Sequence, residues 1–196
     1  MKTIGVSLWS ALRFSLVGMI ICGLLYPLGM TAIGQGLFHK KAEGQLIYNE
    51  EGNVIGSALI GQQFTEPGYF HGRPSSIEYN AGSSGSPNFA PSNPALVERI
   101  NASIEQWEQE NPNVPIEDVP QELLTNSASG LDPHISEASA LVQVPRVSEA
   151  TGLSEETLQE LITANTQGPS LGLFGEAGVN VLELNIDIKA LVEDSQ

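Results

Sequence analysis

Residues 14–38 read FSLVGMIICGLLYPLGMTAIGQGLF, a run of 25 consecutive residues without a charged side chain. A helix needs roughly 20 apolar residues to cross the hydrocarbon core of a bilayer. The apolar core of a secretory signal peptide covers only about 7–15 residues and precedes a small-residue cleavage site, and neither feature fits this run. The sequence therefore predicts one transmembrane helix at residues 14–38, after a tail at residues 1–13.

The small residues of this run allow two interpretations. Gly18, Cys22 and Gly23 could form a face on which a neighbouring membrane helix packs closely. Glycine is also common in membrane helices, so a solitary anchor explains the same residues. Cys22 is the only cysteine of the chain, so the remainder cannot form an internal disulfide bond.

Charge divides the chain into two parts. Residues 1–41 contain four basic and no acidic side chains, whereas residues 42–196 contain four basic and 23 acidic side chains, a net charge of −19. Basic residues flank the apolar run on both sides, so the positive-inside rule does not set its orientation. Long domains translocate largely regardless of charge, which favours a cytoplasmic amino terminus and an acidic extracytoplasmic domain at residues 42–196 in a single-pass cell-membrane protein.

Several function classes leave no trace in the sequence. The acidic domain would repel nucleic-acid phosphates, and it has no basic cluster with interleaved aromatic residues. No GxxxxGK[ST] phosphate loop and no dinucleotide fingerprint occurs. The phosphorylated Asp-Lys-Thr-Gly element of P-type pumps and a potassium-filter motif are missing as well. We therefore expect no ATP hydrolysis by this chain alone.

The acidic domain predicts a mixed α+β fold. The glycine-broken apolar run at residues 52–64 indicates one or two strands, and the Gly/Ser/Pro-rich residues 66–94 indicate a long loop. Asn93 can cap a helix that runs to about residue 109, with Pro94 at its first position. A short helix is expected over residues 136–142, and a longer helix is expected to begin at Ser154. Alternation of apolar and polar residues predicts a strand at residues 182–188.

The stretch at residues 127–136, SASGLDPHIS, contains every residue type of a hydrolytic triad. Composition alone does not make a triad, and no GxSxG nucleophile elbow is present. A structural role, in which Asp132 caps or Ser136 starts a helix, is the favoured interpretation, and metal binding by His71 and His134 lacks ligand spacing. Arg73 and Arg146 are rare cations in an acidic domain; internal salt bridges and recognition of a partner are both open.

Several stretches, in this order, resemble the C subunit of the Kdp-type potassium-transporting P-type ATPase. They are YFHGRPS at 69–75, YN at 79–80, SNPAL at 92–96, SGLDPHIS at 129–136, QVPRV at 143–147 and VNVLELN at 179–185. Together with the apolar run they cover nearly the whole chain.

The resemblance implies a non-catalytic accessory subunit of an ATP-driven, high-affinity potassium uptake complex. Its partners would be a potassium-binding channel-like subunit and an ATP-hydrolysing P-type subunit, with room for a small single-span subunit. The family is regarded as assisting assembly and as a catalytic chaperone that increases ATP affinity, and ATP is the one cofactor that the resemblance implies. Gln143 matches the family's glutamine beside the Pro-Arg pair and is the candidate nucleotide contact.

The topology argument conflicts with that contact, because an extracytoplasmic Gln143 cannot reach cytoplasmic ATP. Any effect on ATP use would then be conformational. Two other functions compete with the accessory subunit. One is a stand-alone, membrane-anchored extracellular binding module. The other is an anchored hydrolase that uses Ser129, Asp132 and His134.

Overall fold

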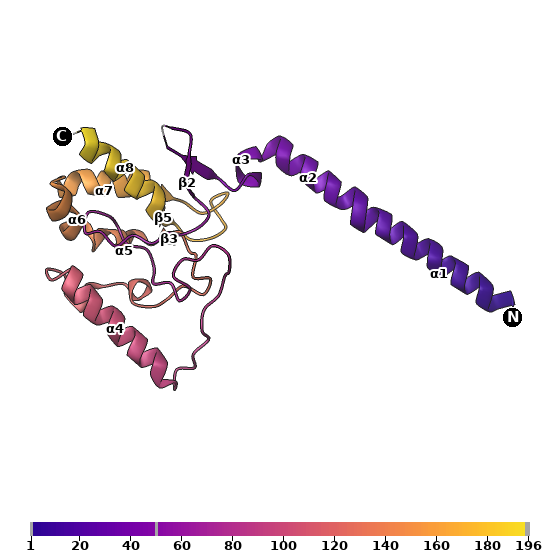
Figure 1. Cartoon of the computed structure of the whole chain (residues 1–196), viewed down its shortest axis with the longest axis horizontal. Helices are drawn as coiled ribbons and strands as arrows, with labels where there is room; N and C mark the ends of the chain where they lie inside the picture. The colour runs from indigo at the N-terminus through magenta and orange to yellow at the C-terminus, as the bar shows by residue number, and fades with distance from the viewer. Residues whose placement is uncertain (1, 50, 195–196) are drawn as a thin grey trace. The chain divides into compact units, whose positions relative to one another are not determined.

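The computed structural model describes residues 2–49 and 51–194. The chain divides into two compact units, residues 1–46 and residues 47–196. The remaining positions of the predicted tail and acidic domain, 1, 50 and 195–196, lie outside the described residues. The fold is mixed helix and sheet, as the sequence predicts, and Figure 1 shows the order of its elements.

The first unit is helical. It consists of α1 (Lys2–Ile20), a π-helical turn η1 (Ile21–Leu25), α2 (Tyr26–Leu37) and the short α3 (His39–Ala42). Pro27 lies in the first turn of α2 and has no backbone N–H, so the wider π-turn just before it accommodates the lost hydrogen bond. By length and composition, Ser7–Leu37 could span a membrane, and this stretch contains almost all of the predicted span.

The second unit begins with a small sheet and an irregular stretch. Strand β1 (Leu46–Tyr48) pairs with β2 (Val54–Ser57), which confirms one strand within residues 52–64. From residue 58 to residue 93 the described chain contains neither helix nor strand, and this stretch includes nearly all of the loop predicted at residues 66–94. The Asn93 side chain then accepts a hydrogen bond from the Ala95 amide and caps α4 (Pro94–Glu110). Two 3-10 turns follow α4, η2 (Ile116–Asp118) and η3 (Gln121–Leu123).

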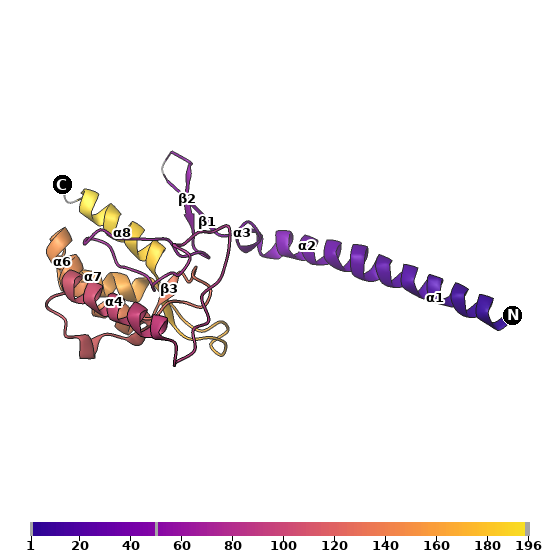
Figure 2. The ribbon, with the colours of Figure 1, turned by 60° about the horizontal axis from the view of Figure 1, so that its bottom comes forward.

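The remainder of the unit combines a three-stranded sheet with four helices. The strands β3 (His134–Ile135), β5 (Gly178–Asn180) and β4 (Thr166–Gln167) lie in the order β3-β5-β4 and are antiparallel, with Ile135 and Thr166 both opposite Val179. The helices are α5 (Glu137–Leu141), α6 (Val144–Thr151), α7 (Glu155–Ala164) and α8 (Val181–Asp194). Helices α7 and α8 lie side by side in both ribbon views (Figure 2).

Two of these helices begin as their sequences predict. The Ser136 hydroxyl accepts from the Ser139 amide at the start of α5, and the Ser154 hydroxyl accepts from the Thr157 amide at the start of α7. Each cap satisfies an amide that the first helical turn leaves without a partner. Helix α6 was not predicted from the sequence.

The predicted strand at residues 182–188 is wrong, because these residues belong to α8. Their apolar positions fit both periods, since Leu182 and Ile186 lie four residues apart and Leu184 and Ile188 do as well. Burial follows the helical period: Val181, Leu184 and Ile188 are buried, whereas Ile186 is only partly buried. Packing of Val181, Leu184 and Ile188 against the core therefore favours the helix over the strand.

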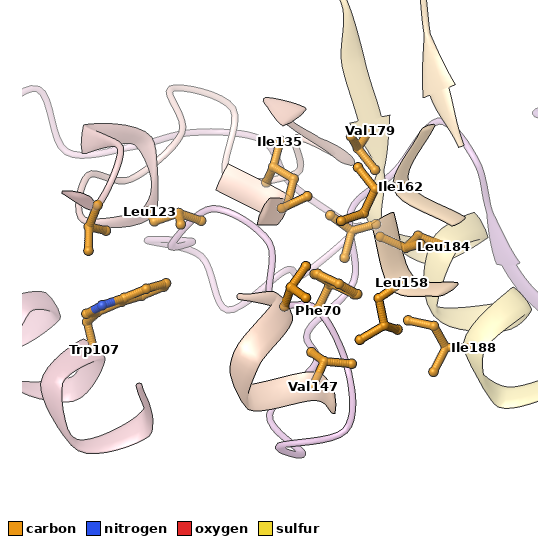
Figure 3. Packing of buried hydrophobic residues seen from close by; sticks show 14 residues of the cluster. Phe70, Trp107, Leu123, Ile135, Val147, Leu158, Ile162, Val179, Leu184 and Ile188 are labelled. Atoms are coloured by element: carbon orange, nitrogen blue, oxygen red, sulfur yellow. The ribbon is translucent and has the colours of Figure 1, made fainter. Parts of the chain in front are cut away.

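The hydrophobic core contains residues from the sheet, the helices and the irregular stretch. Phe70 is fully buried among Val147, Leu158 and Leu184, although no strand or helix carries it (Figure 3). Trp107 of α4 extends the cluster towards Leu123 (Figure 3). A large aromatic side chain from a loop therefore fills the centre of the core, and the loop backbone must follow it inside.

Candidate functional site: a buried polar network

The backbone around Phe70 has buried N–H and C=O groups and no neighbouring strand to pair with. Such groups must find other partners, because an unpaired buried backbone group costs free energy comparable to a lost hydrogen bond. In this protein the partners are side chains. Asn185 of α8 accepts from the Phe70 amide at 2.8 Å and donates to the Phe70 carbonyl at 2.9 Å. Its amide thus replaces an adjacent strand.

Gln143 does the same for the next residue. Its Oε1 accepts from the His71 amide at 2.8 Å, and its Nε2 donates to the His71 carbonyl at 3.0 Å. Nε2 also donates to the Ser139 carbonyl at 3.0 Å, and Oε1 accepts from Arg146 at 2.6 Å. Both donors and both acceptor positions of this amide are therefore occupied within the protein, and the side chain is fully buried.

Arg146 completes this arrangement from the first turn of α6, three residues after Gln143 and on the same helical face. Its Nη1 donates to the carbonyls of Pro67 and Tyr69 at 2.6 and 2.9 Å, and its Nε donates to Asn111 Oδ1 at 2.9 Å. Burial lowers the pKa of Arg146 to about 10, and the nearby Glu110 carboxylate partly opposes this effect. The guanidinium is therefore still charged at neutral pH.

We call these four side chains with their loop backbone the amide–arginine network. Its side chains are Asn111, Gln143, Arg146 and Asn185. Asn180 extends the pattern, because its Nδ2 donates to the Ala58 carbonyl at 2.9 Å. The network links the irregular stretch to α5, α6 and α8 through buried hydrogen bonds.

A second polar cluster joins the SASGLDPHIS stretch to the same loop. Arg73 Nη1 lies 3.2 Å from Asp132 Oδ2 in a half-buried ion pair, so Arg73 forms an internal salt bridge. Asp132 Oδ1 also accepts from the His134 amide at 3.1 Å. Tyr79 donates its hydroxyl hydrogen to the Arg73 carbonyl, and burial together with Asp132 raises the pKa of Tyr79 to about 12, against the opposing effect of Arg73.

Gly130 shows how closely these segments approach each other. Its φ of +69° lies in the left-handed region, and a Cβ at this position would lie 2.6 Å from the Ile77 side chain and 3.0 Å from the Gly85 carbonyl oxygen. Ser75 Oγ donates to the Gly130 carbonyl at 2.7 Å. Only glycine satisfies both the backbone conformation and the space.

Two carboxylates have lowered pKa values for local reasons. The side-chain hydrogen bond with His71 lowers the pKa of Glu110, and its Oε2 lies 3.2 Å from His71 Nδ1. Burial opposes ionisation of Glu122, but hydrogen bonds from Ser139 and from Ser136 outweigh it and lower the pKa. Both groups therefore act as anionic acceptors within the fold.

A cleft of about 260 Å³ opens beside these clusters. His71, Arg73, Tyr79, Trp107 and Glu110 are among the residues that line it. The lining combines one guanidinium with carboxylate, hydroxyl and aromatic groups. Among the residues described, no group of three or more His, Cys, Asp or Glu side chains could hold a metal ion.

The predicted site residues fall into two sets. Gln143 and Arg146 share the amide–arginine network, while Arg73, Asp132 and His134 belong to the second cluster. The proposed triad does not assemble, because Ser129 Oγ contacts Ser127 Oγ and the Leu131 amide, and Asp132 contacts the His134 backbone rather than its ring. Arg146 binds carbonyl and amide oxygens instead of a carboxylate. Nucleotide contact by Gln143 stays a prediction, and it would require this buried network to open.

Sequence reasoning missed the asparagines at 111, 180 and 185 and the carboxylate of Glu122. One signal was available for Asn185, which interrupts an otherwise apolar helical stripe of Val181, Leu184 and Ile188. A polar residue at an apolar position of such a stripe indicates a buried hydrogen-bonding role.

The chain is similar to known proteins over nearly its whole length. A family model described as "KdpC: K+-transporting ATPase, c chain" matches residues 8–190. The chain is 53% identical over 182 residues to the potassium-transporting ATPase KdpC subunit of Bacillus cereus strain AH820, which covers 93% of this chain and 94% of the relative. The subunits of Bacillus thuringiensis subsp. konkukian and Bacillus anthracis strain CDC 684 match with the same identity and coverage.

A match of this extent defines an accessory subunit of a membrane-transport complex. The chain belongs to the KdpC family, the c chain of K+-transporting ATPases. The family resemblance stated from the sequence is thereby confirmed.

Proposed function

We propose that this chain is a non-catalytic subunit of an ATP-driven, high-affinity potassium uptake complex in the cell membrane. The observation that carries the proposal is the family match over residues 8–190, together with relatives named as subunits of a potassium-transporting ATPase. The partners are a potassium-binding channel-like subunit and an ATP-hydrolysing P-type subunit, with room for a small single-span subunit. The stretch Ser7–Leu37 anchors the chain as a single pass, with the amino terminus inside and the acidic domain outside.

Co-purification tests membership of the complex. The chain, carrying an affinity tag, should retain larger polytopic subunits and potassium-stimulated ATPase activity in mild detergent. A tagged chain that purifies alone from cells expressing all subunits would instead favour a stand-alone anchored module.

The non-catalytic role rests on how the polar side chains are used. The Ser129 hydroxyl and the Asp132 carboxylate of the SASGLDPHIS stretch both bind neighbouring groups of the protein. We expect His134→Ala to reduce transport only in proportion to the amount of assembled complex. A fully assembled complex with this substitution and no turnover would indicate a chemical role for His134.

Any effect on ATP affinity is proposed to be conformational. Gln143 is fully buried and has all its hydrogen-bonding positions occupied, which supports a role in holding the loop rather than in touching a nucleotide. The domain thereby presents one rigid surface to its partners, and this rigidity is what would couple to the ATP-hydrolysing subunit.

Two substitutions separate the conformational role from direct contact. Gln143→Ala and Arg146→Lys both disturb the amide–arginine network, but only the first removes the candidate nucleotide contact. Comparable increases in the apparent KM for ATP of the assembled complex are expected from both, because both loosen the same loop. An increase for Gln143→Ala alone, with photoaffinity labelling of this chain by an ATP analogue, would show direct contact instead.

A further inference from the structure

The connection between β4 and β5 carries large apolar side chains that do not reach the core. Leu171 is 89% exposed, Leu173 is 80% exposed and Phe174 is 66% exposed. We call residues 169–175 the apolar loop. Single exposed leucines are common on protein surfaces, but three large apolar side chains within four residues form a concentrated patch of the kind that marks an interaction site.

The apolar loop has a defined conformation. Ser170 and Phe174 pair as an antiparallel bridge, in which the Ser170 amide donates to the Phe174 carbonyl at 2.7 Å and the Phe174 amide donates to the Ser170 carbonyl at 3.0 Å. The Gly172 amide also donates to the Pro169 carbonyl at 2.9 Å. The apolar tip is therefore ordered before any partner arrives, which reduces the entropy lost on binding.

Leu171 occupies an unfavourable backbone conformation for its residue type. Its φ of +56° lies in the left-handed region, which glycine adopts readily and a side chain with a Cβ does not. Leu171 does not belong to the described core cluster, so packing in that cluster does not compensate for the backbone strain. A glycine would serve the turn better, so folding does not explain this leucine, and strain of this kind points to a functional role.

The charge around the apolar loop favours a protein over a lipid bilayer as its binding partner. Membrane-surface segments combine apolar side chains with lysine or arginine, which attract anionic headgroups. The sequence has no lysine or arginine between Arg146 and Lys189, and Glu176 follows the apolar loop directly. A domain with a net charge of −19 is repelled by an anionic membrane surface, so an apolar recess on a protein is the better match.

We infer that the apolar loop docks Leu171, Leu173 and Phe174 into an apolar recess of another protein subunit of the potassium-transporting ATPase complex. This inference rests on the proposed function. Small clusters of buried apolar and aromatic anchors dominate the affinity of protein interfaces, so these three side chains would contribute much of the binding at this contact.

A competition experiment measures how much these three side chains contribute to incorporation of the chain into the complex. Tagged complex is purified from cells that express the wild-type full chain together with a variant full chain, and mass spectrometry gives their ratio in the complex and in the membranes. Leu171→Gly, and Leu173→Ser combined with Phe174→Ser, should be depleted about tenfold or more from the complex, since each lost apolar anchor weakens binding by about ten- to hundredfold. Val97→Ser, which removes a 53% exposed apolar side chain from α4, is the matched control and should be incorporated equally.

Leu171→Gly separates docking from folding. Because glycine relieves the left-handed strain, this variant should unfold at the same or a higher denaturant concentration than wild type, while its incorporation falls. Equal incorporation of the loop variants beside incorporated wild type would overturn the docking inference alone. Absence of the wild-type chain from the complex would overturn the proposed function and this inference with it.

A fluorescent probe tests the bilayer alternative. An environment-sensitive fluorophore is attached at Leu173→Cys in a Cys22→Ser background, so that it is the only labelled thiol. Its emission should shift to shorter wavelength in the assembled complex and stay that of a water-exposed probe when the full chain alone is placed in phosphatidylcholine vesicles. A shift to shorter wavelength in those vesicles would identify lipid as the occupant and refute docking on a protein.

Discussion

Substitution of Arg146 by methionine removes the donor that holds the irregular loop at several points. The guanidinium donates to the Pro67 carbonyl, the Tyr69 carbonyl, Asn111 and Gln143 at 2.6–2.9 Å. Each buried acceptor left without a donor costs about 1–3 kcal/mol. Methionine matches the length of the aliphatic part of the side chain, so we expect a loss of about 3–5 kcal/mol, mostly from the unpaired acceptors.

Arg73→Met provides the matched control, since Arg73 makes one ion pair and its side chain is 26% exposed. A partly exposed pair of this kind contributes about 1 kcal/mol or less. Urea unfolding of the full chain in detergent, followed by Trp107 fluorescence in a Trp9→Phe background, measures both losses. If the two arginine substitutions cost the same within about 1 kcal/mol, the amide–arginine network does not hold the loop as argued.

The remaining predictions concern pH, topology and charge. Hydrogen bonds hold the pKa of Glu122 below its ordinary 4.5, so their stabilisation is present above that value and is lost as the pH falls through the lower folded-state pKa. The difference in unfolding free energy between wild type and Glu122→Gln should therefore shrink from about pH 6 to about pH 3. Glu117→Gln, at an exposed position, should show no such trend. A cysteine at Ser84 in a Cys22→Ser background should react with a membrane-impermeant reagent on intact cells, and labelling only after lysis would reverse the proposed orientation. Neutralising four exposed carboxylates should raise the apparent KM for potassium at low ionic strength and not in high choline salt, because the Debye length falls from about 30 Å at 0.01 M to about 3 Å at 1 M. Suitable positions are Glu98, Glu105, Glu108 and Glu160. An unchanged KM at low salt with normal assembly would leave solubility as the role of the charge.

Features that depend on neighbouring residues were predictable from the sequence. The apolar stretch is recognised by its length, and the caps at Asn93, Ser136 and Ser154 act on amides two or three residues away. Because both partners of each cap lie within one turn, the sequence contains the whole interaction. The family was recognisable for a similar reason, since its motifs are short and contiguous.

Features that depend on distant partners were decided by the tertiary structure. Gln143 and His71 are 72 residues apart in the sequence, Arg146 and Tyr69 are 77 apart, and Asn185 and Phe70 are 115 apart. No local pattern specifies which loop carbonyl a buried amide will meet. The roles of these residues therefore became visible only in the folded chain.

The carboxyl-terminal segment shows the same division within one element. The sequence of residues 181–188 by itself determines that the segment has an apolar face, but its apolar residues satisfy both a strand period and a helical period. Packing of Val181, Leu184 and Ile188 into a core centred on Phe70 selects the helix, and the hydrogen bonds of Asn185 to Phe70 reinforce that choice. Local sequence thus limits the alternatives, and burial against residues far away in the chain decides between them, because only one alternative places both the apolar stripe and its asparagine against their partners.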